Sequence, residues 1–232
     1  GVRAVVSAAE LEAAGMTIAM NGAVVENRDG TKGAAPMRPI LAKDKLRYVG
    51  EPVAVVVADT MAQAKDAAEL IVLDYEDLPA KLDVAPGGAL VHEDVADNLA
   101  FDWGLGDEAA TEAAFAEAAH RVRLEVDDNR IIANSMEPRG CYAEPEGDRL
   151  HVAINGQGVW VQKSQLARAL GVDAETLRVT NPDVGGGFGM KGMFYPEYPV
   201  IAHAARHLNA VTSGLTIPSL VNRSRPRCSA VF

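Results

Sequence analysis

Hydrophobic and polar positions in the first part of the chain follow the spacing of strands and helices in turn. The opening residues predict a strand followed at once by a helix, and residues 46–59, LRYVGEPVAVVVAD, predict a hairpin that turns near Gly50. Thr60 is a suitable N-cap for the next helix, which should give way to a strand ending at Tyr75. The apolar face of that helix carries small or apolar residues: Ala64, Ala67, Ala68 and Ile71.

Residues 84–104 break this pattern. They are rich in turn formers and have little periodicity, so we place a domain boundary or an extended linker there. A second region begins with a short helix capped by Asp107. Alternating apolar residues then predict a strand: Val122, Leu124 and Val126. Residues 149–154 alternate in the same way and lead to Gln157, which stands between two glycines.

The segment VWVQKSQLARALG predicts an amphipathic helix that closes at Gly171, and residues 177–180 predict the next strand. A glycine loop over 185–189 and a final helix follow. The inward positions of the final helix are apolar: Tyr198, Ile201, Ala202, Ala205 and Leu208. Because ligands in mixed α/β folds favour the edge where neighbouring strands end, we expect Gln157 and the loop at that edge.

The chain has 232 residues, enough for one large domain or two modest ones. Its formal net charge of −10 and pI near 5.0 give no reason to expect binding to nucleic acid or an anionic membrane surface. No apolar run is long enough to span a membrane, and no export signal is visible. Cys141 and Cys228 provide neither a disulfide framework nor a C-x-x-C metal motif, so we expect a reducing, cytoplasmic setting.

Residues 209–232 differ in composition from the rest of the chain, with three arginines and no acidic residue. They show no clear periodicity, and we expect this segment to be disordered or foreign to the fold. The chain also opens on a strand without an initiating methionine, which suggests a start in the middle of a fold. A truncated or frameshifted gene product would explain the tail.

The loop NPDVGGGFGMKGMF, residues 181–194, is the first candidate for chemistry. Glycines let backbone N–H groups approach an anionic or planar ligand, because no Cβ stands in the way. Phe188 could present its ring to a flat substrate, and Gln157 offers both donors and an acceptor. The candidate floor of a cofactor and substrate site comprises Gln157, Gly185, Gly186, Gly187, Phe188 and Gly189. The alternative is a tight turn in which Phe188 fills the core.

Two other groups of residues have simpler alternatives. In SMEPRG, Glu137 is held extended before a proline and Arg139 would fit a carboxylate or phosphate, but a surface ion pair at a turn explains both residues equally well. His203 and His207 have a spacing that can bind a metal, yet no third ligand is apparent. The sequence contains no motif for a nucleophilic serine or cysteine and no P-loop, so nothing here carries nucleophilic or acid–base catalysis unaided.

The order of these pieces resembles the molybdenum-pterin hydroxylases, the family of xanthine dehydrogenase, aldehyde oxidase and aerobic carbon monoxide dehydrogenase large subunits. MEPR is followed by a strand that leads to Gln157, the helix LARALGV, the strand LRVTNPDV and then GGGFGMK; the last part is most similar to the carbon monoxide dehydrogenase-like large subunits. Residues 46–84 are similar to the family's hammerhead domain. The resemblance implies an α+β fold with a hammerhead domain over 1–83, a linker over 84–105, part of the first molybdopterin-binding domain over 106–208 and a divergent tail over 209–232.

The resemblance also implies a cofactor, a molybdenum-pyranopterin in the form of Mo-molybdopterin or its cytosine dinucleotide. Gln157 and Phe188 would lie near the molybdenum and the substrate, and no side chain would bind the metal. The implied chemistry is hydroxylation of a carbon with oxygen from water, or oxidation of carbon monoxide. Electrons would pass to a 2Fe-2S small subunit and an FAD-binding medium subunit in a dimer of heterotrimers. Gly192 stands where xanthine-oxidising relatives have a glutamate, which argues against xanthine.

Two hypotheses follow for the function. In the first, the chain is the amino-terminal part of a large subunit that acts on an aldehyde, an N-heterocycle or carbon monoxide. It is then inactive alone or active only with the missing segments, since the resemblance places the family's base, a glutamate, far downstream. In the second, it is an inactive remnant or an assembly domain that binds no cofactor. An unrelated Rossmann-type binder is a weaker third hypothesis, because no acidic residue stands at the distance needed to hold a ribose. Pterin content separates the first two.

Overall fold

A computed structural model describes residues 1–20, 22, 24–128, 131–214 and 227–232. The chain divides into two compact units. The first unit comprises Gly1–Asn21, Met37–Leu78 and Ala133–Phe232, and the second comprises Gly22–Pro36 and Pro79–Ile132. Each unit is described separately below. No helix among the described residues is long and apolar enough to cross a membrane.

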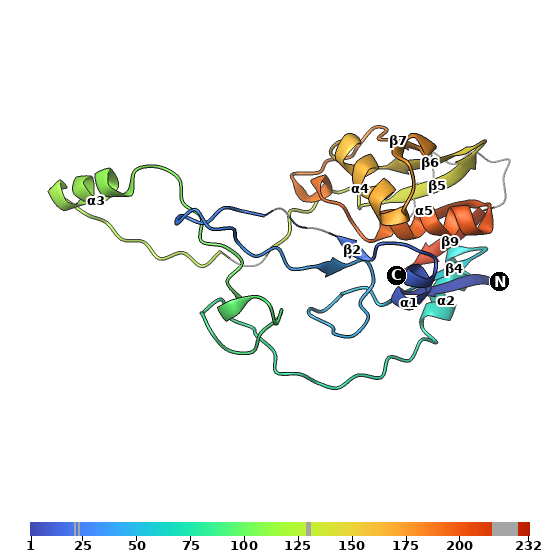
Figure 1. Ribbon diagram of the computed structural model, residues 1–232, viewed down its shortest axis with the longest axis horizontal. Helices are drawn as coiled ribbons and strands as arrows, with labels where there is room; N and C mark the ends of the chain where they lie inside the picture. The colour runs from blue at the N-terminus through green and yellow to red at the C-terminus, as the bar shows by residue number, and fades with distance from the viewer. Residues whose placement is uncertain (21, 23, 129–130, 215–226) are drawn as a thin grey trace. The chain divides into compact units, whose positions relative to one another are not determined.

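Within the described residues of the first unit, seven strands form one mixed sheet in the order β1-β4-β9-β8-β5-β6-β7 (Figure 1). The strands are β1 Val2–Ser7, β4 Ala54–Ala58, β5 Cys141–Glu146, β6 Arg149–Ile154, β7 Leu177–Thr180, β8 Val211–Gly214 and β9 Arg227–Val231. β6 pairs with β7 in parallel, as β8 does with β9, and the other neighbours are antiparallel. β2 Ala19–Met20 and β3 Arg38–Pro39 form a separate pair. The expected mixture of strands and helices is confirmed.

Helices cover both faces of this sheet. They are α1 Ala8–Ala13, α2 Met61–Ala68, α4 Trp160–Leu170 and α5 Glu197–Leu208, with short 3-10 turns η2 Ala174–Thr176 and η3 Met190–Gly192. Val55 and Val57 of β4 belong to the main core with α1, α4 and α5, whereas Val56 and Ala58 pack with α2 on the other face. This division follows from the two-residue period of a strand, which points successive side chains to opposite faces. Figure 1 shows α5 running along β5 and β6, with α4 beside it.

Most helix ends of the first unit lie where their sequence signals indicate, but α2 ends at Ala68, so the predicted apolar face does not extend to Ile71, which is exposed. The Thr60 side chain accepts a hydrogen bond from the Gln63 N–H at the start of α2, and Gly171 ends α4 with a φ of 64°. α5 carries the largest apolar face and ends at Asn209, with a φ of 47°. Buried residues of α5 include the predicted inward positions: Tyr198, Ile201, Ala202 and Ala205. Leu208 is partly buried against the same core.

The second unit has little core of its own. It contains α3 Glu108–Glu117, which begins as predicted with the Asp107 carboxylate accepting from the Ala110 N–H at 2.8 Å, and the 3-10 turn η1 Ala96–Asn98. The segment 27–34 lies against 99–102, where Arg28 forms an ion pair with Asp102 at 2.9 Å and a hollow of about 390 Å³ opens. Residues 84–104 contain no strand, and the linker assigned there stays a prediction.

Three predicted strands are absent. Residues 46–53 do not form a hairpin with β4, which pairs instead with β1, and neither the segment ending at Tyr75 nor the one at 122–126 is a strand. A strand persists only where a neighbour completes its hydrogen bonds, and these segments have no such neighbour among the described residues.

The prediction that the tail is disordered or foreign to the fold is also wrong where the structure describes it. Residues 211–214 and 227–231 form β8 and β9 inside the sheet. Cys228 and Ala230 of β9 add to the main core, and Val211 of β8 packs with Tyr142 and Ala153, which explains this placement. Residues 215–226 lie outside the described residues.

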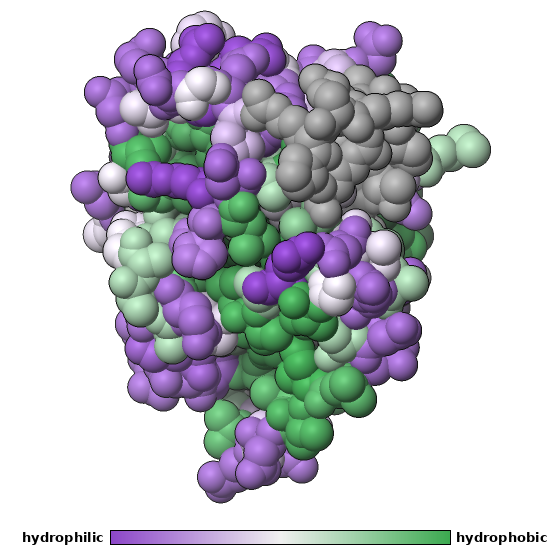
Figure 2. Space-filling view, turned by 90° about the vertical axis from the view of Figure 1, so that its right-hand side faces the viewer, coloured by the Kyte–Doolittle hydropathy of each residue, from purple (hydrophilic) through white to green (hydrophobic). Residues whose placement is uncertain are grey.

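Exposed apolar side chains predict self-association of the chain. Leu124 is 81% exposed, and the alternating neighbours Val122 and Val126 are exposed with it. Figure 2 shows hydrophobic side chains in contact with one another along the middle and lower part of one face. Unpaired strand-like segments and apolar patches favour association, so we expect concentration-dependent oligomers and dye binding by exposed apolar surface.

Light scattering after size exclusion checks this expectation. Replacing Val122, Leu124 and Val126 together with threonine should reduce the oligomer fraction, whereas Val49→Thr, at another fully exposed valine, should not. A monodisperse, cooperatively unfolding monomer at all concentrations would contradict it.

Candidate functional site

Three chain segments meet at one edge of the sheet in the first unit. β6 and β7 are parallel, so the residues after Ile154 and after Thr180 leave the sheet at the same edge. β5 runs antiparallel to β6 with Cys141 opposite Ile154, so the residues before Cys141 arrive at that edge too. The predicted convergence of Gln157 and the glycine loop is confirmed. The arrival of residues 135–140 beside them was not predicted.

Two asparagine side chains join these segments. Asn155 accepts from the Gly140 N–H at 2.7 Å and donates to the Pro138 carbonyl at 2.7 Å. Asn181 accepts from the Gly156 N–H at 3.1 Å and donates to the Gly156 carbonyl at 2.8 Å. Each amide therefore continues the hydrogen bonding of the sheet for one more step beyond the strand ends.

Gln157 is held by the chain just after the glycine loop. Its N–H donates to the Lys191 carbonyl at 3.1 Å, and its Oε1 accepts from the Lys191 N–H at 3.1 Å. The residue is exposed, and its Nε2 group has no hydrogen-bond partner among the described residues. The side chain is thus oriented by its oxygen and keeps its donor for a ligand.

Close contacts explain why two of the loop positions are glycine. A Cβ on Gly187 would lie 2.5 Å from Gln157 Oε1, and a Cβ on Gly185 would lie 2.7 Å from the Cβ of Glu137. Both distances are shorter than atoms in contact allow. Gly186 has a φ of 92°, which a residue with a side chain rarely adopts. The loop is therefore almost free of side chains because its neighbours stand directly against its backbone.

Phe188 lies at the surface. It is 76% exposed and has a φ of 52°, so the alternative in which this ring fills the core is wrong. Within the part of the chain that the structure describes, the N–H groups of residues 186–189 donate to no protein acceptor. Successive free N–H groups beside left-handed residues form a concave donor surface that suits anions.

A buried ion pair lies under the loop. The ammonium of Lys191, whose side chain is 0% exposed, contacts Glu137 Oε2 at 2.7 Å, and the same oxygen accepts from the Gly185 N–H at 2.8 Å. The hydrogen bond from Lys191 lowers the pKa of the Glu137 carboxyl below its usual value. Sequence reasoning did not pair these residues; the antiparallel return of β5 beside β6 is the feature that would have suggested it.

Arg139 is occupied by the protein itself. Its Nε donates to Glu197 Oε1 at 2.8 Å, and its guanidinium carbon lies 3.8 Å from the centre of the Tyr195 ring. Glu197 is buried at the start of α5. The ion-pair alternative for Arg139 is therefore confirmed, although the pair is partly buried rather than on the surface, and this arginine is not free for a ligand.

The histidine pair does not extend to a metal site. The rings of His203 and His207 are stacked with centres 5.9 Å apart on α5, and no group of three suitable ligands exists among the described residues. Cys141 and Cys228 are both buried and unbridged. Burial raises the pKa of the Cys141 thiol, which keeps that group neutral.

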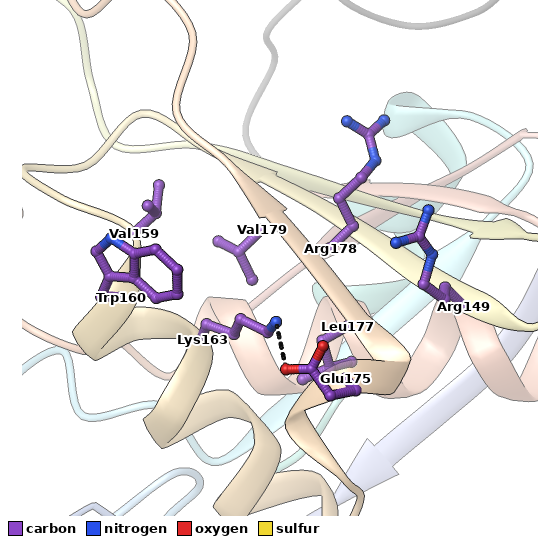
Figure 3. Close-up of a pocket in the computed structure, with 8 residues that line it drawn as sticks. All are labelled: Arg149, Val159, Trp160, Lys163, Glu175, Leu177, Arg178 and Val179. Carbon is purple, nitrogen blue, oxygen red and sulfur yellow. Dashed lines mark hydrogen bonds and ion pairs between the residues drawn. The ribbon is translucent and has the colours of Figure 1, made fainter.

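A separate hollow of about 200 Å³ lies beside β7, at the edge of the sheet (Figure 3). Its lining comprises Arg149, Val159, Trp160, Lys163, Glu175, Leu177, Arg178 and Val179. Lys163 is paired with Glu175 at 3.5 Å, and Arg178 and Arg149 are paired with Glu146 at 2.8 Å and 4.0 Å, so all three of its cations already have partners. Ligand pockets usually exceed roughly 300 Å³. The sheet edge that carries Gln157 and the glycine loop 185–189, called the loop edge below, is the better candidate site because its donors are unpaired among the described residues, although the hollow at residues 27–34 and 99–102 is larger.

Comparison with known proteins bears on this edge. The family profile described as "Molybdopterin cofactor-binding domain" matches residues 91–213, which include Gln157 and the loop. The profile described as "Aldehyde oxidase and xanthine dehydrogenase, a/b hammerhead domain" matches residues 1–79. Both profiles agree with the resemblance that the sequence motifs indicated.

Several relatives are similar over most of this chain. The nicotine 6-hydroxylase large subunit of Paenarthrobacter nicotinovorans is 38% identical over 175 residues, 73% of this chain and 21% of that protein. The carbon monoxide dehydrogenase large chain of Hydrogenophaga pseudoflava is 32% identical over 183 residues, 71% of this chain and 23% of that protein. The structure of quinoline 2-oxidoreductase from Pseudomonas putida 86 superposes with a TM-score of 0.72 at 28% identity, over 100% of this chain and 27% of that one. The chain therefore spans about a fifth of the length of the curated relatives it matches.

Proposed function

Because this chain belongs to the molybdenum hydroxylase large-subunit family, with a hammerhead domain and a molybdopterin cofactor-binding domain, we propose that the loop edge forms one wall of the molybdopterin site. The observation that carries the proposal is the set of unpaired donors there. The N–H groups of residues 186–189 and the Nε2 group of Gln157 have no protein acceptors among the described residues.

These residues fit the cofactor. Phosphate and oxo groups accept hydrogen bonds, and a backbone without side chains lets such groups come close. When bound, the cofactor supplies a molybdenum centre that hydroxylates a carbon with oxygen from water. Gln157 would donate a hydrogen bond near that centre, and the exposed ring of Phe188 would offer a flat apolar surface to the substrate. No side chain of this set would bind the metal.

Substrate and partners follow from the relatives by analogy. We propose an aldehyde, an N-heterocycle or carbon monoxide as substrate, since the names of relatives include nicotine, carbon monoxide and aldehyde. The relatives are described as large subunits or chains, and we propose a 2Fe-2S small subunit and an FAD-binding medium subunit as partners in a cytoplasmic dimer of heterotrimers. Iron–sulfur clusters need cysteine thiolates, and both cysteines here are buried, which supports placing the clusters on a partner.

Cofactor content tests the proposal directly. We expect molybdenum by elemental analysis, and pterin by fluorescence after oxidation, in stoichiometric amounts in the chain purified from cells that make the cofactor. A chain mixed with the same extract after purification controls for adsorbed metal. Folded chain without pterin would favour the alternative, an inactive remnant or an assembly domain that binds no cofactor.

A further inference from the structure

We propose that Glu137 and Lys191 are positioning residues, a partly buried ion pair that holds both ends of the glycine loop so that the backbone between them keeps one conformation. Its consequence for cofactor binding rests on the proposed function. Its effect on the loop does not, because that effect can be measured without any ligand.

A single oxygen atom joins the two ends of the loop. Glu137 Oε2 accepts from the Gly185 N–H at 2.8 Å and contacts Lys191 Nζ at 2.7 Å. The unpaired N–H groups of residues 186–189 lie between these two points in the sequence. Gln157 adds two hydrogen bonds to the backbone of Lys191. Within the loop, the Met190 N–H donates to the Gly187 carbonyl at 2.9 Å, so a local turn spans Phe188 and the contacts at Gly185 and Lys191 tie this turn to the protein.

The middle of the loop needs these anchors. Phe188 adopts a φ of 52°, a left-handed conformation that is strained for a residue with a bulky side chain. Its ring is mostly exposed and so does not hold the backbone by packing. Strained conformations persist only where the surroundings impose them. The Met190–Gly187 hydrogen bond closes the turn around Phe188, and the contacts at Gly185 and Lys191 fix that turn against the rest of the first unit.

The two side chains are buried to different extents, so removing one of them should disturb the loop more than removing the other. The Lys191 side chain is 0% exposed, whereas that of Glu137 is 32% exposed. Removing the acid leaves a buried cation without a partner, which a protein interior tolerates poorly. Removing the cation leaves a partly hydrated carboxylate that still accepts from Gly185. Glu137→Gln should therefore loosen the loop more than Lys191→Met.

Backbone amide exchange by NMR tests this order in the full chain without added cofactor. We expect exchange at Gly185 and Lys191 to become about tenfold faster in Glu137→Gln, and less so in Lys191→Met, as expected for loss of a charge-assisted hydrogen bond. Lys163→Met is the matched control, because Lys163 also has a carboxylate partner, Glu175, but lies away from the loop. Protection of the β6 amides shows that each variant is folded.

A pH titration adds a measurement that would not change if the substitutions only lowered the overall stability of the chain. The Gly185 amide shift should follow the ionisation of Glu137, whose pKa is lowered from its usual value near 4.5 mainly by Lys191. Since this pKa is depressed in the folded chain, the pair is complete above the usual value and is lost as pH falls through the folded pKa. In Lys191→Met, the midpoint of this pH titration should move to a higher pH. The same variant provides the test if Glu137→Gln does not fold.

The outcomes separate this proposal from the proposed function. Faster exchange together with loss of pterin supports both. Faster exchange in the variants, with no pterin even in the unsubstituted chain, supports the positioning role and counts against the cofactor site. Unchanged loop exchange and an unchanged midpoint in Lys191→Met overturn the positioning role, whatever the pterin content.

Discussion

Gly187→Val should reduce the molybdopterin content of the purified chain at least about tenfold while leaving the fold intact. Any side chain at this position begins with a Cβ that would lie 2.5 Å from Gln157 Oε1. The Cβ would also lie 2.7 Å from Gln157 Cδ and 2.9 Å from its Cγ, so the whole side chain must move, and it then loses its hydrogen bond from the Lys191 N–H. The unpaired Nε2 donor is displaced with it. Elemental analysis and pterin fluorescence measure the cofactor content, and the thermal unfolding midpoint checks that the fold is intact.

Gly192→Val is the matched control for this substitution. Gly192 lies a few residues further along the same loop, has open space where its Cβ would stand and does not adopt a positive φ. We expect it to keep the cofactor content of the unsubstituted chain. Equal losses in both variants would mean that any added bulk near the loop prevents binding, and the specific role of the Gly187–Gln157 contact would then be wrong.

Ile201→Ala should destabilise the first unit by about 2–5 kcal/mol, the usual range for removing a large buried aliphatic side chain. Ile201 is 0% exposed in the middle of α5. Its side chain packs so closely on β8 that a Cβ on Gly214 would lie 2.9 Å from Ile201 Cδ1. Domains are commonly stable by about 5–15 kcal/mol in total, so this single change removes a large fraction. Urea unfolding followed by circular dichroism measures it.

Val161→Ala on α4 provides the comparison. Val161 is exposed, and substitutions at such positions usually change stability by less than about 0.5 kcal/mol. The difference between the two variants matters more than either absolute value. Similar unfolding midpoints would mean that α5 does not hold the sheet together, and the core assigned to the first unit would need to be redrawn.

Local signals in the sequence were sufficient for the elements that stabilise themselves or pack on a near neighbour. Helix α4 begins and ends where its apolar period and Gly171 indicate, and Gln157 meets the glycine loop because β6 and β7 are parallel neighbours. The strand predicted up to Tyr75 is absent because it has no such neighbour among the described residues. Residues 70–73 are all apolar and include β-branched side chains, but no described segment lies beside them to complete a ladder.

Pattern and spacing in the sequence could not predict contacts between positions that are far apart along the chain. Glu137 and Arg139 look alike in the sequence as a charged pair flanking a proline, yet one supports the loop and the other binds Glu197. Nothing in the hexapeptide distinguishes these roles. What distinguishes them is the register of β5 on β6, which brings one side chain under Gly185 and the other towards α5.

The position of β9 in the sheet has a consequence for how the first unit is assembled. β9 lies between β4 and β8, so Val56 pairs with Val231 from the far end of the sequence. Contacts this distant in sequence must wait for long loop closures, which slow folding. During synthesis, β4 leaves the ribosome long before its second neighbour, β9, exists. The hammerhead strands and the strands that carry the loop edge therefore reach their common sheet only in a late step, which should be the slow phase of refolding.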